Sequence, residues 1–184
     1  GFPDRAVLSA QESESFSMLI NDGKGNFTPH SVFQKHPLMG HTYFEMVDFN
    51  KDGKLDFIVT NGDNGEYPSP MKKYHGIRIY LNRGENRFEE AYFYPMNGAF
   101  KAVARDFDQD GDLDIAAISF FPDYQKSPEE SFVYLENDGK MRFTASTFPE
   151  CVAGRWLTME VGDLVGEGAQ EIVLGSYIHL RMPV

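Results

Sequence analysis

Short runs in which apolar and polar residues alternate follow one another along the whole chain. Turns rich in Gly, Asn and Asp separate them. Runs of this length, regularly spaced and bounded by turn residues, predict β-strands of an all-β protein. No segment combines a helical period with helix caps, so no long helix is expected. The strands are predicted at 4–9, 16–20, 27–33, 42–47, 55–60, 77–81, 87–94, 100–105, 113–120, 131–135, 141–147, 156–161 and 171–177.

An acidic stretch of nine residues lies between two predicted strands at three places. It reads DFNKDGKLD at 48–56, DFDQDGDLD at 106–114 and DLVGEGAQE at 163–171. The second copy starts 58 residues after the first, and the third starts 57 residues after the second. Each copy runs into a short apolar stretch. A fixed period of this length indicates a repeat architecture.

Four antiparallel strands in each repeat describe a blade of a β-propeller. The predicted strands group as three, four, four and two. This grouping predicts one propeller segment of about three blades: a partial blade at 1–34, blades at 35–94 and 95–148, and a partial blade at 149–184. Such an open array would expose strand edges. We therefore expect self-association with a second copy, or the remainder of a longer propeller, to complete it.

The first two acidic stretches place side-chain oxygens at loop positions 1, 3, 5 and 9, with glycine at position 6. This spacing suits a hard cation, and calcium above all. An EF-hand needs glutamate at position 12, but Val59 and Ala117 stand there, inside predicted strands. A thrombospondin-type calcium array needs many cysteines, and Cys151 is the only one. The remaining alternative is an acidic turn without metal, in which the carboxylates would repel one another.

The acidic loops alternate with a hairpin motif of the type Leu-Asn-Asp-Gly, found at 19–27, 81–84 and 135–139. Together the two motifs resemble the FG-GAP and VCBS repeats of integrin α-subunit propellers and of many secreted bacterial proteins. The resemblance implies a β-propeller whose loops between the first and second strands of each blade bind Ca²⁺. It also implies a secreted, periplasmic or cell-surface location.

The resemblance further implies which residues hold the ions. The third loop is the weaker candidate, because Val165 cannot ligate from position 3 and glutamates replace two aspartates. In the first two loops the residue at position 7 would ligate through its carbonyl oxygen. The implied ligands are Asp48, Asn50, Asp52, Lys54 and Asp56; Asp106, Asp108, Asp110, Asp112 and Asp114; and, in the weaker third loop, Asp163, Glu167 and Glu171.

Composition narrows the class of partner. The 184-residue chain has a formal net charge of -11, which makes nucleic acid an unsuitable partner because phosphate binding needs a basic surface. No run of apolar residues is long enough for membrane insertion. An extracellular protein or a glycan remains as the expected partner.

In a propeller the acidic loops share one face, and the long loops between the second and third strands share the opposite face. Aromatic side chains beside a few polar groups suit recognition of a sugar or a protein surface. The alternative role for each of these aromatic side chains is packing between neighbouring blades instead of ligand binding. The candidate ligand-binding residues on that opposite face are Tyr67, Tyr74, Tyr124, Arg155 and Trp156.

Alternation along the first strand of each blade predicts a core face and a face that lines the central channel. The predicted channel residues are Tyr43, Glu45, Lys101, Val103, Arg105, Thr158 and Glu160. Ion pairs among them are the plainer interpretation, and a catalytic role is the alternative.

These patterns predict a calcium-binding recognition scaffold for protein or glycan rather than an enzyme. No nucleophile and base stand together near the acidic loops. The calcium is expected to lock the turn rather than to take part in catalysis. Two alternatives stay open: part of a secreted polysaccharide-degrading enzyme, and a purely structural repeat module.

Overall fold

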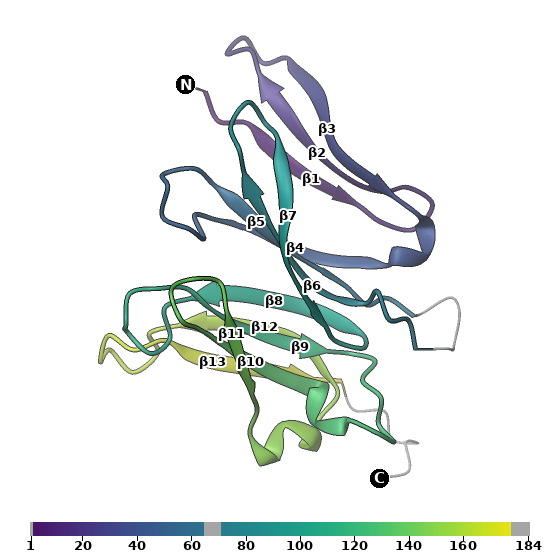
Figure 1. The fold of residues 1–184 in the computed structure, drawn as a ribbon, viewed down its shortest axis with the longest axis vertical. Coiled ribbons are helices and arrows are strands. Elements are labelled where there is room, and N and C mark those ends of the chain that lie inside the picture. Colours follow the sequence, from purple (N-terminus) through teal and green to yellow (C-terminus); the bar gives the residue numbers. More distant parts are fainter. Residues whose placement is uncertain (1, 65–70, 178–184) are drawn as a thin grey trace.

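The chain folds into antiparallel β-sheets joined by turns (Figure 1). The computed structural model describes residues 2–64 and 71–177, which hold thirteen strands in four sheets. Three short 3-10 helices, Pro37–Met39, Pro128–Ser131 and Pro149–Ala153, are the helices of this described part. None of its helices is long and apolar enough to cross a membrane. The prediction of an all-β fold is confirmed.

Within each sheet the strands pair in chain order. Sheet 1 contains β1 (Arg5–Ser9), β2 (Glu14–Asn21) and β3 (Phe27–Lys35). Sheet 2 contains β4 (His41–Val47), β5 (Asp56–Asn61), β6 (Gly76–Asn82) and β7 (Phe88–Pro95). Sheet 3 contains β8 (Ala99–Arg105), β9 (Asp114–Ser119), β10 (Phe132–Asn137) and β11 (Phe143–Ser146). Sheet 4 contains β12 (Trp156–Gly162) and β13 (Glu171–Ser176).

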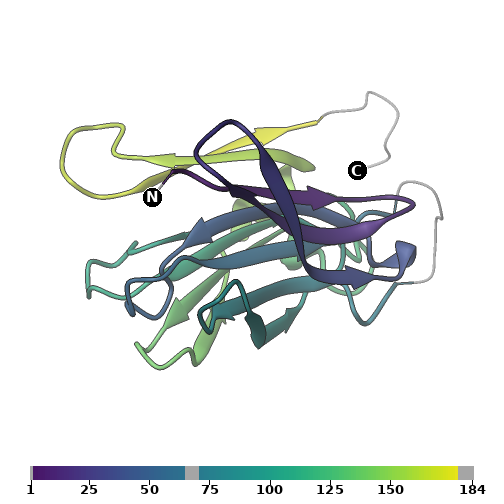
Figure 2. The same ribbon diagram turned by 90° about the horizontal axis from the view of Figure 1, so that it is seen from above.

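Sheet 1 lies at the top of Figure 1 with sheet 2 below it, and sheets 3 and 4 lie side by side in the lower part. Their first strands adjoin, because β4 lies against β8 and β8 lies against β12. The acidic loops between β4 and β5, β8 and β9, and β12 and β13 lie on the left in Figures 1 and 2, and the β9–β10 connection lies on the right in Figure 1. The two kinds of loop therefore lie at opposite ends of the molecule, as the sequence predicts.

Buried apolar side chains fill each space between neighbouring sheets. Between sheets 1 and 2 the Phe57 ring stacks on Phe16 at 4.2 Å and on Tyr80 at 4.7 Å between ring centroids. A second cluster joins sheets 2 and 3 around Ile58, Ile79 and Ile115. Strands β5 and β9 are buried at all six of their positions, since each lies in a sheet that is covered on both faces.

The prediction that one face of each first strand lines a channel is wrong at Val103. This side chain is only 3% exposed and packs in the core between sheets 3 and 4, together with Met159 and Cys151. Alternation along β8 therefore separates two inter-sheet cores, because a neighbouring sheet covers each face. The charged members of the set form ion pairs instead: Arg105 with Glu45 at 2.6 Å, and Lys101 with Glu160 at 2.8 Å.

The first strand of sheets 2, 3 and 4 carries the same irregularity. The register of pairing shifts between His41 and Tyr43, between Ala99 and Lys101, and between Trp156 and Thr158. The residue skipped each time, Thr42, Phe100 or Leu157, stands six positions before the first aspartate of the acidic loop. The β-bulge thus repeats with the same period as the loop, although the residue types at the bulge differ.

Candidate metal centre

The second acidic loop joins β8 to β9 and brings three carboxylates together. Asp106, Asp108 and Asp110 each offer an oxygen within 4.8 Å of the other two. In the part of the chain that the structure describes, no other trio of Asp, Glu, His or Cys side chains meets this criterion. Positive φ angles at Gln109 and Gly111 turn the backbone so that the three side chains converge.

Main-chain NH groups hold these carboxylates from inside the loop. Asp106 Oδ2 accepts from Gly111 N at 3.1 Å, and Asp108 Oδ1 accepts from Asp110 N at 3.1 Å. Asp106 Oδ1 is buried and has no hydrogen-bond partner, and Asp112 Oδ1 is in the same state. Buried oxygens of this kind normally have a partner. Burial, together with the charges of Asp110 and Asp114, raises the pKa of Asp112. A hard cation with oxygen ligands fits this donor set.

Asp114, at loop position 9, is fully buried and is held by protein donors. Its Oδ1 accepts from Asn137 N at 2.9 Å, and its Oδ2 accepts from the Tyr134 hydroxyl at 2.6 Å. Asn137 Nδ2 donates back to Leu113 O at 3.1 Å. We call this pair of bonds, in which the asparagine of the hairpin donates its NH to the carboxylate and its side chain to the carbonyl of the residue before the acidic one, the carboxylate–asparagine clamp. It ties the loop to the β10–β11 hairpin.

The clamp recurs in sheets 1 and 2. Asp56 accepts from Asn82 N at 2.7 Å and from Phe49 N at 2.9 Å, while Asn82 Nδ2 donates to Leu55 O at 3.0 Å. Burial raises the pKa of Asp56, and these NH groups oppose the rise. In sheet 1, Asp4 accepts from Asn21 N at 2.7 Å. The hairpin motif places Asn21, Asn82 and Asn137 at the same position of a turn, but the local sequence does not predict their contact with the acidic residue.

In the first acidic loop, backbone NH groups and a lysine of the loop itself bind the carboxylates. The two oxygens of Asp48 accept from Asp52 N at 3.0 Å and Gly53 N at 2.9 Å. Lys54 Nζ contacts Asp52 Oδ2 at 3.0 Å, and this bond is the main cause that lowers the pKa of Asp52. Asn50 lies 3.5 Å from the same oxygen. The predicted ligands of this loop therefore lie near one another, but its three leading side chains do not form a carboxylate trio.

A pocket of about 210 Å³ lies between the first and second acidic loops. Lys51 of the first loop crosses this space, and its ammonium donates to Gly111 O of the second loop. Asp112 forms part of the pocket wall. The positive charge of Lys51 lowers the pKa of Asp112 and so opposes part of the rise that burial causes. The lining includes Phe49, Lys51, Asp110, Asp112, Asn137 and Met141.

The third loop keeps the turn without the trio. Asp163 accepts from Gly166 N at 2.7 Å, Glu167 N at 3.1 Å and Gly168 N at 3.0 Å. Glu171, at the clamp position, accepts from Leu164 N at 2.6 Å. Val165 is 66% exposed. The two glycines with positive φ and the carboxylate of Asp163 are thus sufficient to form this turn.

A family model described as FG-GAP-like repeat matches residues 1–59 and 48–117. The chain belongs to the FG-GAP-like repeat family. Among curated proteins no match to the chain is found. The two FG-GAP matches share residues 48–59, which are the first acidic loop and most of β5. Each FG-GAP match therefore ends just after an acidic loop, and the second one contains the carboxylate trio.

At the other end of the FG-GAP segment the five candidate ligand residues have different surroundings. Tyr67 lies outside the described residues. Tyr74 packs its ring edge-on against the buried His75 at 5.4 Å, and its carbonyl accepts from Asn61 and Arg78. Trp156 packs into the core between sheets 3 and 4, and its Nε1 donates to Cys151 O at 2.7 Å. Arg155 is half-buried, whereas Tyr124 is 51% exposed.

Proposed function

We propose that this FG-GAP segment is a calcium-stabilised recognition scaffold of a secreted, periplasmic or cell-surface protein, with a protein or a glycan as its partner. The proposal assigns it no reaction. Two acid–base contacts join its sheets: Glu45 and Arg105 form an ion pair between sheets 2 and 3, and Glu14 and His41 form a buried pair between sheets 1 and 2. The FG-GAP repeats form sheets that pack against one another, and such a packed array is a rigid support for the loops at its two ends.

The observation that carries the calcium part is the trio of Asp106, Asp108 and Asp110. Calcium takes oxygen ligands at about 2.3–2.6 Å, so two ligands on opposite sides of one ion lie about 5 Å apart. The 4.8 Å limit on the trio is within this reach. The unpartnered Oδ1 of Asp106 supplies a buried acceptor that a cation would satisfy. Asp112, through its carbonyl, and Asp114 are the further ligands that the proposal assigns.

The test compares calcium binding and thermal unfolding in calcium and in excess chelator. With a dissociation constant of about 10⁻⁴–10⁻³ M and about 5 mM Ca²⁺, binding stabilises the fold by roughly 1–2 kcal/mol. The melting temperature should therefore rise by a few degrees in calcium. Asp110→Ala should abolish most of this rise and lower the stoichiometry measured by titration calorimetry.

Glu85→Gln is the matched control, because it also removes one carboxylate but from a side chain that is 85% exposed. It should behave like the unaltered protein. If chelation leaves the melting temperature unchanged, the calcium part of the proposal is wrong. Release of reducing ends from a polysaccharide by the purified protein would contradict the non-enzymatic assignment.

A further inference from the structure

Arg155 is fixed in place before β12, at the end of the molecule away from the acidic loops. Its guanidinium lies over the Phe120 ring at 3.8 Å and over the Phe121 ring at 4.8 Å. Its Nε donates to Phe120 O at 2.8 Å. The backbone is held as well, because Arg155 N donates to Ser176 Oγ and Arg155 O accepts from Tyr177 N. The side chain therefore needs little further ordering to bind a ligand.

Arg78 also stacks on an aromatic ring, but unlike Arg155 its guanidinium is bound by acceptors within the protein. It lies over the Phe93 ring at 4.0 Å, and its terminal nitrogens donate to Asn61 Oδ1 and to Tyr74 O. Glu90 lies 3.5 Å from its Nε. Among the described residues Arg155 has no carboxylate within 4.0 Å, and Phe120 O is the acceptor of its one side-chain hydrogen bond. The two terminal nitrogens of Arg155 thus remain available.

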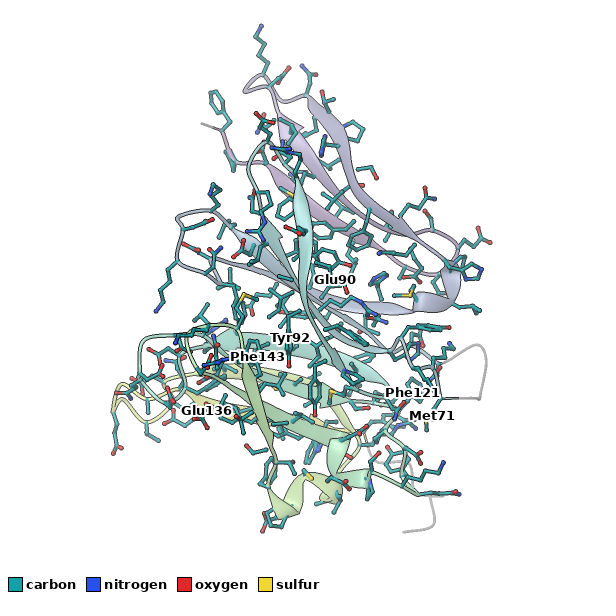
Figure 3. The ribbon with its side chains drawn as sticks, in the orientation of Figure 1. Met71, Glu90, Tyr92, Phe121, Glu136 and Phe143 are labelled. Atoms are coloured by element: carbon teal, nitrogen blue, oxygen red, sulfur yellow. The ribbon has the colours of Figure 1, made fainter. Side chains whose placement is uncertain are left out.

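Aromatic and apolar side chains surround this arginine. The Phe120 ring is also packed against Phe100 at 5.6 Å. Tyr124 is exposed and lies close enough for the charge of Arg155 to lower its pKa, against the larger effect of burial, which raises it. Met71 is 45% exposed, and Figure 3 places it and Phe121 at the same end of the molecule. The result is a rigid aromatic platform around one cation.

We propose that Arg155, Phe121 and Tyr124 form a binding site for a carboxylate-bearing sugar unit of an acidic glycan. The planar guanidinium makes two parallel hydrogen bonds to the carboxylate, and the rings pack against the C–H face of the sugar. This inference rests on the proposed recognition function and names the class of ligand for it.

The net negative charge of the chain disfavours densely charged acidic ligands. The chain carries a net charge of -11, which repels a densely sulfated polymer or a run of acidic residues at long range. One cation beside the half-buried Phe121 ring and the exposed Tyr124 ring fits a ligand whose carboxylate is set on a ring with an apolar face. Uronic acid residues within an oligosaccharide have this chemistry, whereas an acidic peptide would find one charge and no second basic partner among the contacts of Arg155.

The test titrates the full chain in calcium with oligogalacturonate, with its methyl ester, with maltotetraose and with an oligoaspartate peptide. The free uronate should bind at least tenfold more tightly than the ester or maltotetraose. Arg155→Lys keeps the charge but loses the paired hydrogen bonds, and it should lower uronate affinity at least tenfold. Tyr124→Ala should also weaken binding. Arg83→Lys is the control, because Arg83 is exposed and pairs with Glu89.

Melting curves of each variant show whether it is folded, so that loss of binding is separated from loss of structure. Equal binding of uronate and ester, or binding that Arg155→Lys leaves intact, overturns the inference while recognition of glycans survives. Tighter binding of the peptide overturns it in favour of a protein partner. If no glycan binds to the unaltered protein, the inference and the glycan part of the proposed function both fail, and calcium binding is judged separately by chelation.

Discussion

At the scale of single residues, the carboxylate at the end of each of the first two acidic stretches ties the loop to a hairpin of the same sheet. Asp56 and Asp114 are both fully buried, and each accepts the backbone NH of an asparagine in that hairpin. A buried charge is tolerated where donors of this kind surround it. The clamp therefore stabilises the fold through hydrogen bonds that need no metal.

Replacement of Asp114 by Ala should lower the free energy of unfolding by about 2–4 kcal/mol, because it leaves the NH of Asn137 and the hydroxyl of Tyr134 without their acceptor. Urea denaturation in excess chelator measures the loss, so that a lost metal ligand does not contribute. Glu136→Ala, an exposed position beside Asn137, should have little effect. A loss as small for Asp114 as for Glu136 would show that the clamp does not stabilise the fold.

The approach of the carboxylates of Asp106, Asp108 and Asp110 could be predicted from local spacing, because side chains at alternate positions of one tight loop lie near one another. The clamp could not, since Asp56 and Asn82 are 26 residues apart. The hairpin motif was visible at both positions, but only the register of β5 with β6 brings its asparagine to the loop. The bond from Lys51 to the neighbouring loop depends on sheet packing and has no sequence signal at all.

At the scale of elements, neighbouring sheets approach so closely that some positions between them have no room for a side chain. A Cβ atom at Gly62, just after β5, would lie 2.2 Å from Ala99 N and 2.3 Å from Ala99 O, at the start of β8. These are backbone atoms that cannot rotate away. The absence of a side chain at Gly62 thus sets the distance between the ends of sheets 2 and 3.

Gly62→Ala should lower the free energy of unfolding by more than about 2 kcal/mol, because the added methyl group forces the two sheets apart. Gly162→Ala is a suitable comparison, since its Cβ would meet nothing within 4 Å and its φ is not positive. Thermal unfolding of both variants measures the difference. Equal melting temperatures would mean that the two sheets adjust at this point without cost.

The strands themselves were predictable because alternation and turn residues mark them. Their faces were harder to assign, as Val103 shows. In a sheet with one solvated face, alternation distinguishes inside from outside. Here both faces of sheets 2 and 3 are covered, so residues such as Val103 and Ala104 are buried on opposite sides. Which sheet covers which face is a tertiary property that a single strand does not encode.

At the scale of the whole molecule, the described residues give sheets of three, four, four and two strands, the grouping predicted from the sequence. Strand β13 is the edge of the two-stranded sheet, and Val173 on it is 49% exposed. Leu157 on the neighbouring β12 is 37% exposed. An edge strand with exposed apolar residues offers NH and CO groups to another chain.

We therefore expect this chain to self-associate as its concentration rises, and we expect Val173→Lys to weaken the association. A lysine at the edge adds charge that would have to be desolvated in a strand-to-strand contact. Sedimentation velocity over a wide concentration range measures the effect, with Thr144→Lys on β11 as the control for added charge. A single monomeric species at every concentration would contradict this expectation.

The clamp in sheet 1 has a consequence for how such repeats diverge. Asp4 accepts from Asn21 N, and Asn21 Nδ2 donates to Pro3 O, so this hairpin is attached by the same contacts as those of sheets 2 and 3. Attachment of the hairpin and the carboxylate trio of Asp106, Asp108 and Asp110 thus depend on different residues, and Asp114 alone belongs to both the clamp and the proposed ligand set. A repeat is free to lose or regain its ion ligands by single substitutions while its hairpin stays attached. Under the calcium binding proposed above, the number of bound ions would differ between related arrays, and each added ion would stabilise the end of the molecule that carries the acidic loops.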